Sequence, residues 1–163
     1  MPVNTKNVPR RTLRFNSLED LDAELARIER ADRDGGLSHT GNWTPGQILG
    51  HIAAWLEFGW NGYPPELRPP RLVRWVLMLR KARYLRDGLP VGVRIPGLKD
   101  GTLGIEPMTT ADGLARLRRT LEPLRRGEDQ PFDSPGFGKL SNAEAIQGNL
   151  RHAELHLGFL RYE

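Results

Sequence analysis

Four histidines are the residues of this sequence whose chemistry is most informative. His152 and His156 stand four positions apart, so their imidazoles leave the same face of a helix. His51 directly precedes an apolar position of another expected helix, whereas His39 falls in an expected loop. Neutral imidazoles that converge between two helices bind a divalent metal and leave positions open for water or substrate. The spacing therefore predicts a metal site of His51, His152 and His156; ordinary buried, hydrogen-bonded histidines are the alternative.

Two side-chain amides accompany these histidines. Gln47 lies one turn before His51, and Asn149 lies one turn before His152, so each shares a stripe with a histidine. We expect Gln47 and Asn149 to act as catalytic residues that orient the nucleophile or the substrate. No carboxylate shares these stripes, because Glu154 points away from the histidines on either side of it. Acids that could enter from elsewhere are Asp22, Glu29 and the loop carboxylates.

The absence of cysteine limits the chemistry further. With no cysteine in the chain, disulfides, thiolate zinc sites and cysteine nucleophiles are excluded. Any thiol in the reaction must therefore be an external cosubstrate, whose pKa a bound metal would lower as it lowers that of water. Basic residues that could receive an anionic tail of such a cosubstrate, or else are solvated surface charges, are Arg68, Arg71, Arg94 and Lys99.

Five helical segments are expected to position these side chains. Each has apolar residues at three- and four-residue spacing or a capping residue at its start, such as Thr44 and Ser141. The segments are 17–34, 44–61, 71–86, 109–124 and 141–160. Gly- and Pro-rich residues 87–108, and then 125–139, form long irregular loops, of which the first is of a length that is often functional. The fold class is therefore all-α, a four-helix bundle with residues 71–86 as one accessory helix.

Length and composition favour a single soluble domain. The chain has 163 residues, 38% apolar and 27% charged, with a mean hydropathy of −0.52. No stretch approaches the ~20 apolar residues of a membrane span, and the opening MPVNTKNVPRR has no apolar region of a secretory signal. We expect one domain over residues 1–163, with 1–16 as an extended arm, in the cytoplasm.

Positive charge is concentrated between Arg68 and Arg86. The net charge is +4, yet this stretch holds seven basic residues and no acid. It could meet nucleic acid, an anionic membrane face or an anionic substrate, although a solvated arginine-rich face is the simplest interpretation. Its run 75–79 is apolar on nearly every side, whereas a membrane-surface helix has one apolar face. We therefore expect partial burial of this helix, and no groove-reading motif suggests nucleic acid.

Three segments resemble a domain-of-unknown-function branch of the DinB/YfiT-like superfamily. They read GNWTPGQILGHIAAWLEFGWNGYP, PPRLVRWVLMLRKARYLRDGLPVGVRIP and FGKLSNAEAIQGNLRHAELHLGFL, and they cover most of the chain after about residue 40. The resemblance implies a DinB-like bundle of up-down-down-up topology with three metal-binding histidines, at positions that match His51, His152 and His156. Leu155 and Ser134 stand where the branch often has histidine, and neither is a position of the triad.

The resemblance also bears on function. Relatives in the superfamily include metal-dependent transferases and isomerases that use a low-molecular-weight thiol, and proteins described as hydrolases. It thus implies a metal-dependent hydrolase or thiol-dependent transferase acting on a small molecule, with a divalent zinc, nickel or iron ion. The alternative is a non-catalytic helical module, in which the histidines or the metal are structural and the helix at 71–86 binds an anionic partner. A homodimer is compatible with both.

Overall fold

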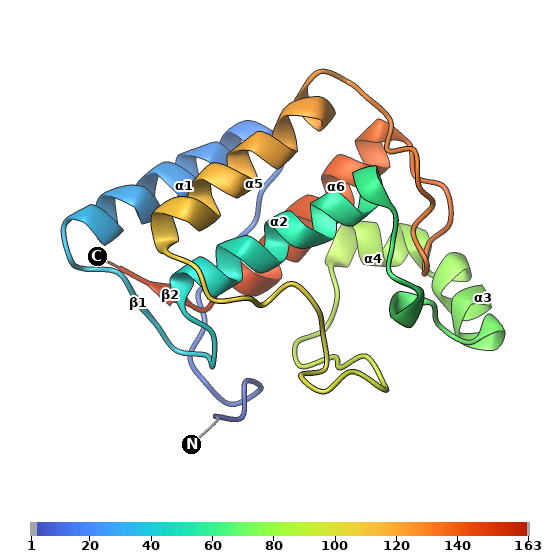
Figure 1. Ribbon diagram of the computed structural model, residues 1–163, viewed down its shortest axis with the longest axis horizontal. Coiled ribbons are helices and arrows are strands. Elements are labelled where there is room, and N and C mark those ends of the chain that lie inside the picture. The colour runs from blue at the N-terminus through green and yellow to red at the C-terminus, as the bar shows by residue number, and fades with distance from the viewer. Residues whose placement is uncertain (1–2, 163) are drawn as a thin grey trace.

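The computed structural model describes residues 3–162, and this part of the chain is mostly helical (Figure 1). Its helices are α1 (Leu18–Arg33), α2 (Pro45–Asn61), α3 (Arg71–Leu79), α4 (Lys81–Asp87), α5 (Thr110–Arg125) and α6 (Asn142–Leu157). A 3₁₀ turn covers Pro65–Leu67, and the short strands β1 (Ser38–His39) and β2 (Leu160–Arg161) pair antiparallel. The prediction of a helical protein is confirmed at this level. Within the described residues, no helix is both long and apolar enough to cross a membrane.

The predicted capping residues start the four long helices. In α2, the Thr44 hydroxyl accepts a hydrogen bond from the backbone N–H of Gln47, whose side chain accepts one from the backbone N–H of Thr44. Ser141 and Glu144 form the same reciprocal pair at the start of α6. Such caps satisfy backbone N–H groups that have no partner within the helix. The N-caps of the four helices are Ser17, Thr44, Thr109 and Ser141.

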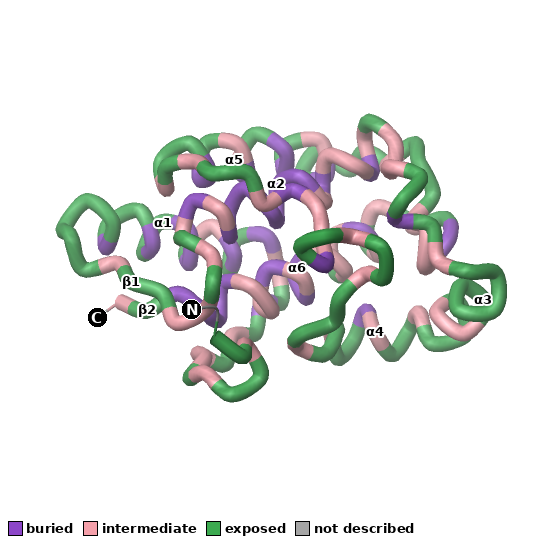
Figure 2. Tube along the Cα trace, turned by 60° about the horizontal axis from the view of Figure 1, so that its bottom comes forward, coloured by how far each residue is buried: buried purple, intermediate pink, exposed green. Residues whose placement is uncertain are grey.

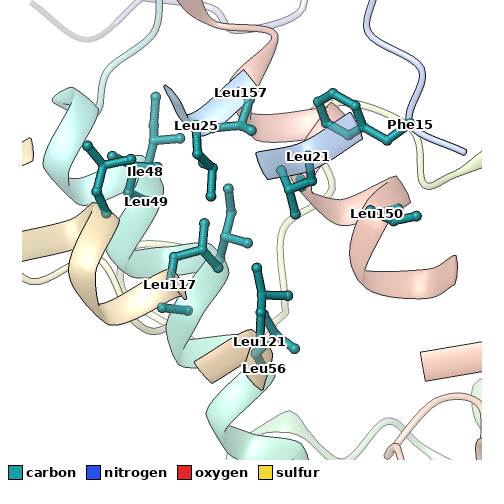
Figure 3. Packing of buried hydrophobic residues seen from close by; sticks show 14 of the residues in the cluster. Phe15, Leu21, Leu25, Ile48, Leu49, Leu56, Leu117, Leu121, Leu150 and Leu157 are labelled. Carbon is teal, nitrogen blue, oxygen red and sulfur yellow. The ribbon is translucent and has the colours of Figure 1, made fainter. Parts of the chain in front are cut away.

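The four long helices surround one apolar core (Figure 3). Helix α2 contacts α5 and α6, and α1 contacts the same two helices. Each helix contributes leucines that are completely buried: Leu25 from α1, Leu49 from α2, Leu117 from α5 and Leu157 from α6. The apolar spacing of the sequence is thus realised as one shared interior, and it brings α2 next to α6.

The predicted single helix at 71–86 is wrong, because the structure divides it into α3 and α4. At Arg80 the backbone leaves helical geometry, with φ −98° and ψ 6°, and its N–H donates to carbonyls of the last turn of α3. Within α3, which has no buried residue, partial burial holds only for Val76 and Leu77, whereas Leu85 of α4 is buried (Figure 2). Helix α4 packs on α6, and α3 extends away from the core.

The segment before α1 lies against the end of α6. The backbone N–H of Arg11 donates to the carbonyl of Gly158 at 2.8 Å, and its guanidinium donates to the carbonyls of Leu157 and Leu160. The aromatic ring of Phe15 is buried in the core, while its N–H donates to the Glu154 carboxylate at 2.5 Å. Arg11 and Phe15 therefore fix the C-terminal end of the helix that carries two of the histidines.

Replacement of Gly46 by alanine is expected to lower the free energy of unfolding by about 1–2 kcal/mol, measured by chemical denaturation. A Cβ atom at Gly46 would meet the backbone of Met108 and Thr109, the latter at 2.8 Å, and a backbone cannot rotate away. This overpacking costs about 1–3 kcal/mol, which exceeds the part of the ~1 kcal/mol helix-propensity gain that applies in the first turn. The control is Gly36→Ala, whose Cβ would meet nothing closer than 3.9 Å. Equal stability of the two variants would contradict the steric argument.

Candidate metal centre

Contact between α2 and α6 brings the three predicted histidines together. His51 points from α2, and His152 and His156 point from α6, toward a common centre where one nitrogen of each ring lies within 4.8 Å of the others. The Nε2 atoms of His51 and His152 are 3.2 Å apart, and the ring centroids of His51 and His156 are 4.5 Å apart. His39 is exposed on β1, a short strand where the sequence suggested a loop, and is not part of this cluster.

The distances within the cluster fit a metal ion. Nitrogens bound ~2.0–2.1 Å from a tetrahedral zinc lie about 3.3–3.4 Å apart, close to the 3.2 Å between His51 and His152. The third nitrogen is within 4.8 Å, so it needs only a small side-chain movement to reach the same ion. The 3.2 Å separation also allows one imidazole to donate a hydrogen bond to the other, which is the alternative of ordinary buried histidines.

Burial keeps the three imidazoles neutral, which is the state that binds metal. It lowers the pKa of His51 to about 4, although the hydrogen bond to the Leu103 carbonyl acts in the opposite direction. Burial, together with the neighbouring imidazoles, also holds the pKa of His152 and that of His156 well below the usual range. Because His51 Nδ1 lies 2.8 Å from the Leu103 carbonyl oxygen, Nδ1 carries the proton and Nε2 keeps its lone pair for the centre.

Two tryptophans flank the histidines. The indole of Trp43 stacks on His156, with ring centroids 5.3 Å apart and an interplanar angle of 21°. Trp55 presents an edge to His152 at 5.7 Å and to His51 at 5.9 Å. The Nε1 atom of Trp55 is buried and has no hydrogen-bond partner among the described residues, although the ring lines a cavity. Among the described residues it is therefore a buried donor left without a partner beside the histidines.

The cavity beside the histidines has a volume of about 930 Å³. Its walls come from α2, α6, residues 3–6 and the loop that follows α4, and they are mostly apolar. The predicted functional loop 87–108 thus contributes to the site. The cavity is large enough for a small organic molecule, and all three histidines lie on its wall.

The two predicted catalytic amides have different surroundings. Asn149 lines the cavity, with its Nδ2 donating to the carbonyl of Ala145 at 2.8 Å. The Gln47 amide is occupied at both ends: its oxygen caps α2, and its nitrogen donates to the carbonyl of Ile105 at 2.9 Å. Gln47 does not belong to the described cavity wall. Its hydrogen bond to Ile105 holds the same loop whose Leu103 carbonyl contacts His51.

Of the predicted anion-binding residues, Arg94 lines the cavity. Lys6, which was not among them, lines it as well. Arg68, Arg71 and Lys99 do not belong to the wall that residues 3–162 form. Of the acids that could have entered from elsewhere, Asp22 pairs with Arg125 and Glu29 with Arg118, and neither belongs to the described cavity wall.

Tyr63 is a cavity residue that the sequence did not indicate, and Asp100 is one of the loop carboxylates that the sequence allowed for without naming it. Both lie outside the helices, where no periodicity predicts the direction of a side chain. The one available signal was the position of Asp100 in the long loop expected to be functional. Burial raises the pKa of Tyr63 to about 12, so its phenol keeps its proton and can donate a hydrogen bond to a ligand.

Comparison with known families gives one match. A family model described as "Protein of unknown function (DUF1569)" matches residues 8–163. The chain has no significant match among curated proteins or among solved structures.

Proposed function

The chain belongs to the DUF1569 family of proteins of unknown function, and for this member we propose a metal-dependent enzyme that acts on a small molecule. One observation carries the proposal: three neutral histidines, with ring nitrogens within 4.8 Å of one another, line a cavity of about 930 Å³. Structural zinc sites are closed by four protein ligands, whereas catalytic sites keep a position open. Among the described residues the cluster has three candidate ligands, which favours catalysis over a structural role.

His51, His152 and His156 would hold the ion, which is zinc, nickel or iron in this proposal. When bound, such an ion supplies Lewis acidity that lowers the pKa of water or of a thiol. Trp43 and Trp55 cover the imidazoles and keep bulk water away from them.

The remaining polar side chains of the cavity bind and orient the substrate. Asn149 lies one turn before His152 and is the amide placed to orient the reacting group. The protonated phenol of Tyr63 donates a hydrogen bond, and the cations of Arg94 and Lys6 receive an anionic group.

The proposed reaction class rests on the absence of cysteine from the chain and on the resemblance to the DinB/YfiT-like superfamily. Hydrolysis and transfer of an external low-molecular-weight thiol both use a metal-activated nucleophile, and a thiol must be external because the chain has no cysteine. We further propose that α1, α2, α5 and α6 form a DinB/YfiT-like bundle of up-down-down-up topology, supported by their mutual contacts. A homodimer and a cytoplasmic location remain predictions.

The direct test is a calorimetric titration of the metal-free full chain with Zn²⁺, Ni²⁺ and Fe²⁺, followed by assays of the loaded protein. We expect binding of one ion per chain, and turnover of an aryl ester or conjugation of a small thiol to an electrophile. No binding of any of the three ions would overturn the metal proposal. Binding without either activity, together with exclusion of small ligands from the cavity, would favour the structural alternative.

Replacement of Gly104 by alanine is expected to weaken metal binding by about 10–100-fold, the range for groups that orient a ligand. Gly104 has φ +76° and follows Leu103, whose carbonyl holds the imidazole of His51. An added Cβ would lie 2.6 Å from the Cβ of Ala54 and would displace this carbonyl. The measurement is the dissociation constant of the ion.

The matched control is Gly97→Ala in the same loop. Gly97 also has a positive φ, +88°, but an added Cβ would meet nothing within 4 Å. Both variants therefore carry backbone strain, and only Gly104→Ala collides with α2. Equal metal affinity of the two variants would show that the Leu103 carbonyl does not orient His51.

A further inference from the structure

Helix α3 presents an apolar face to solvent. Leu72, Trp75 and Leu79 are 73%, 59% and 66% exposed, and their spacing of three and four residues places them on one side of the helix. Large apolar side chains exposed together mark an interaction surface more often than isolated ones do. We call these three residues the α3 face.

Helix α3 contacts the protein through Leu77 and the end of Met78. A side chain added at Gly136 would meet Leu77 at 3.2 Å, and one added at Gly138 would meet the end of Met78 at 3.6 Å. The loop before α6 therefore lies under α3. The run 75–79, apolar on nearly every side in the sequence, is thus divided. Val76 and Leu77 are half-buried, whereas Trp75, Met78 and Leu79 are exposed. This division removes the objection that the helix lacks a single exposed apolar face.

Arginines surround the α3 face without compensation by acids. No acid occurs between Arg68 and Arg86, and within residues 3–162 no ion pair involves Arg68, Arg71, Arg74 or Arg80. The basic residues that do pair belong to α4: Lys81 contacts Glu144 at 2.7 Å, and Arg86 contacts Asp87 at 2.8 Å. Positive charge is therefore concentrated beside the apolar face, where a partner must supply negative charge.

We propose that α3 docks on an anionic lipid surface, lying in the plane of the interface. Leucine and tryptophan would enter the boundary of the acyl chains, as in interfacial helices, and the arginines would meet the headgroups. Tryptophan is enriched at this depth because its ring is apolar and its N–H is polar. The inference is independent of the metal site.

Two other occupants fit the surface less well. A second copy of the chain would bring the same four arginines against each other, which repels. A nucleic acid would neutralise the arginines, but its phosphate backbone offers nothing to cover the leucines. Lipid matches both the charge and the apolar stripe.

The test is sedimentation of the full chain with vesicles of equal phosphatidylglycerol and phosphatidylcholine, and with vesicles of phosphatidylcholine alone. We expect binding to the anionic vesicles only, weakening as salt is raised. Leu72→Ser with Leu79→Ser should weaken binding at least tenfold by removing apolar contact. Arg71→Glu with Arg74→Glu should weaken it by roughly 25-fold or more, since each arginine contributes roughly fivefold.

The charge control is Arg30→Glu with Arg33→Glu on α1, which changes the net charge equally at the other end of the molecule (Figure 1). This variant should bind like the wild type, and circular dichroism should show all variants folded. The proposal is overturned if anionic vesicles are not bound, if neutral vesicles bind equally, or if the α3 and α1 variants lose binding to the same extent. It is also overturned if the α3 face mediates dimers in ultracentrifugation, or if the protein binds duplex DNA or RNA in preference to the anionic vesicles.

Discussion

Metal content is expected to fall from about one ion per chain to background when His51, His152 or His156 is replaced by alanine. Each histidine supplies one of three nitrogens that lie within 4.8 Å of one another, and no other His, Cys, Asp or Glu of residues 3–162 belongs to this cluster. Loss of one ligand therefore leaves two, and the affinity should drop by more than the ~10–100-fold that loss of a supporting group costs. Elemental analysis and calorimetric titration of each variant measure the loss.

The matched control is His39→Ala. His39 is exposed on β1, outside the cluster, and its replacement should leave both the stoichiometry and the affinity unchanged. Unfolding of the metal-free proteins separates loss of a ligand from loss of the fold, because added metal should raise the melting temperature of the wild type and of His39→Ala only. Wild-type metal content in all three cluster variants would contradict the metal site and would favour the alternative, in which the histidines are hydrogen-bonded core residues.

The helices and the histidine cluster could be predicted because their information is local. Thr44 and Ser141 fix the first turns of α2 and α6, and every later side-chain direction in each helix follows from 3.6-residue periodicity. On either helix, the residue that directly precedes a core residue therefore lies at the edge of the contact between the two helices. His51 and His152 occupy such positions, so spacing predicted their side-chain directions, whereas the contact between α2 and α6 comes from the structure.

The cavity could not be predicted in the same way, because loops build much of it. Asp100 and Tyr63 reach it through irregular backbone whose path depends on tertiary contacts rather than on a repeating pattern. Gln47 illustrates the reverse case. Gln47 lies on the same side of α2 as His51, as its spacing predicted. Its amide is nevertheless occupied by the capping box and by the Ile105 carbonyl, although we expected it to orient a substrate.

The stretch 71–86 differs from its prediction for a third reason. Its apolar residues are continuous, so periodicity could not say which of them face the protein. The structure ends the helix at Leu79 and turns Leu77 toward the loop before α6, which leaves Leu72 and Trp75 exposed. The helix breaks at Arg80, after nine residues, and no proline or glycine in the sequence marks this position.

Substitution of Arg11 by methionine is expected to lower the free energy of unfolding by about 3 kcal/mol, the cost of leaving a buried charge without its partner. The Glu24 side chain is 2% exposed, and its Oε1 atom accepts from the Arg11 guanidinium at 2.5 Å. The same guanidinium donates to the carbonyls of Leu157 and Leu160, so its loss also frees the end of α6. Methionine keeps the apolar stem of the side chain, so the change removes the charge and the hydrogen bonds of the guanidinium but not its apolar contacts. Urea denaturation at neutral pH measures the effect.

Arg27→Met provides the comparison on the same carboxylate. Arg27 lies 3.5 Å from the other Glu24 oxygen, but its side chain is 65% exposed, whereas that of Arg11 is 22% exposed. Solvent screens the outer pair, so its removal should cost less than about 1 kcal/mol. The double variant Arg11→Met with Glu24→Met should regain part of the loss, because no charge remains buried. If Arg11→Met and Arg27→Met destabilise the protein equally, burial of Glu24 is not what makes the inner pair important. The end of helix α6 would then be held by apolar contacts such as those of Phe15, and not by the Arg11 guanidinium.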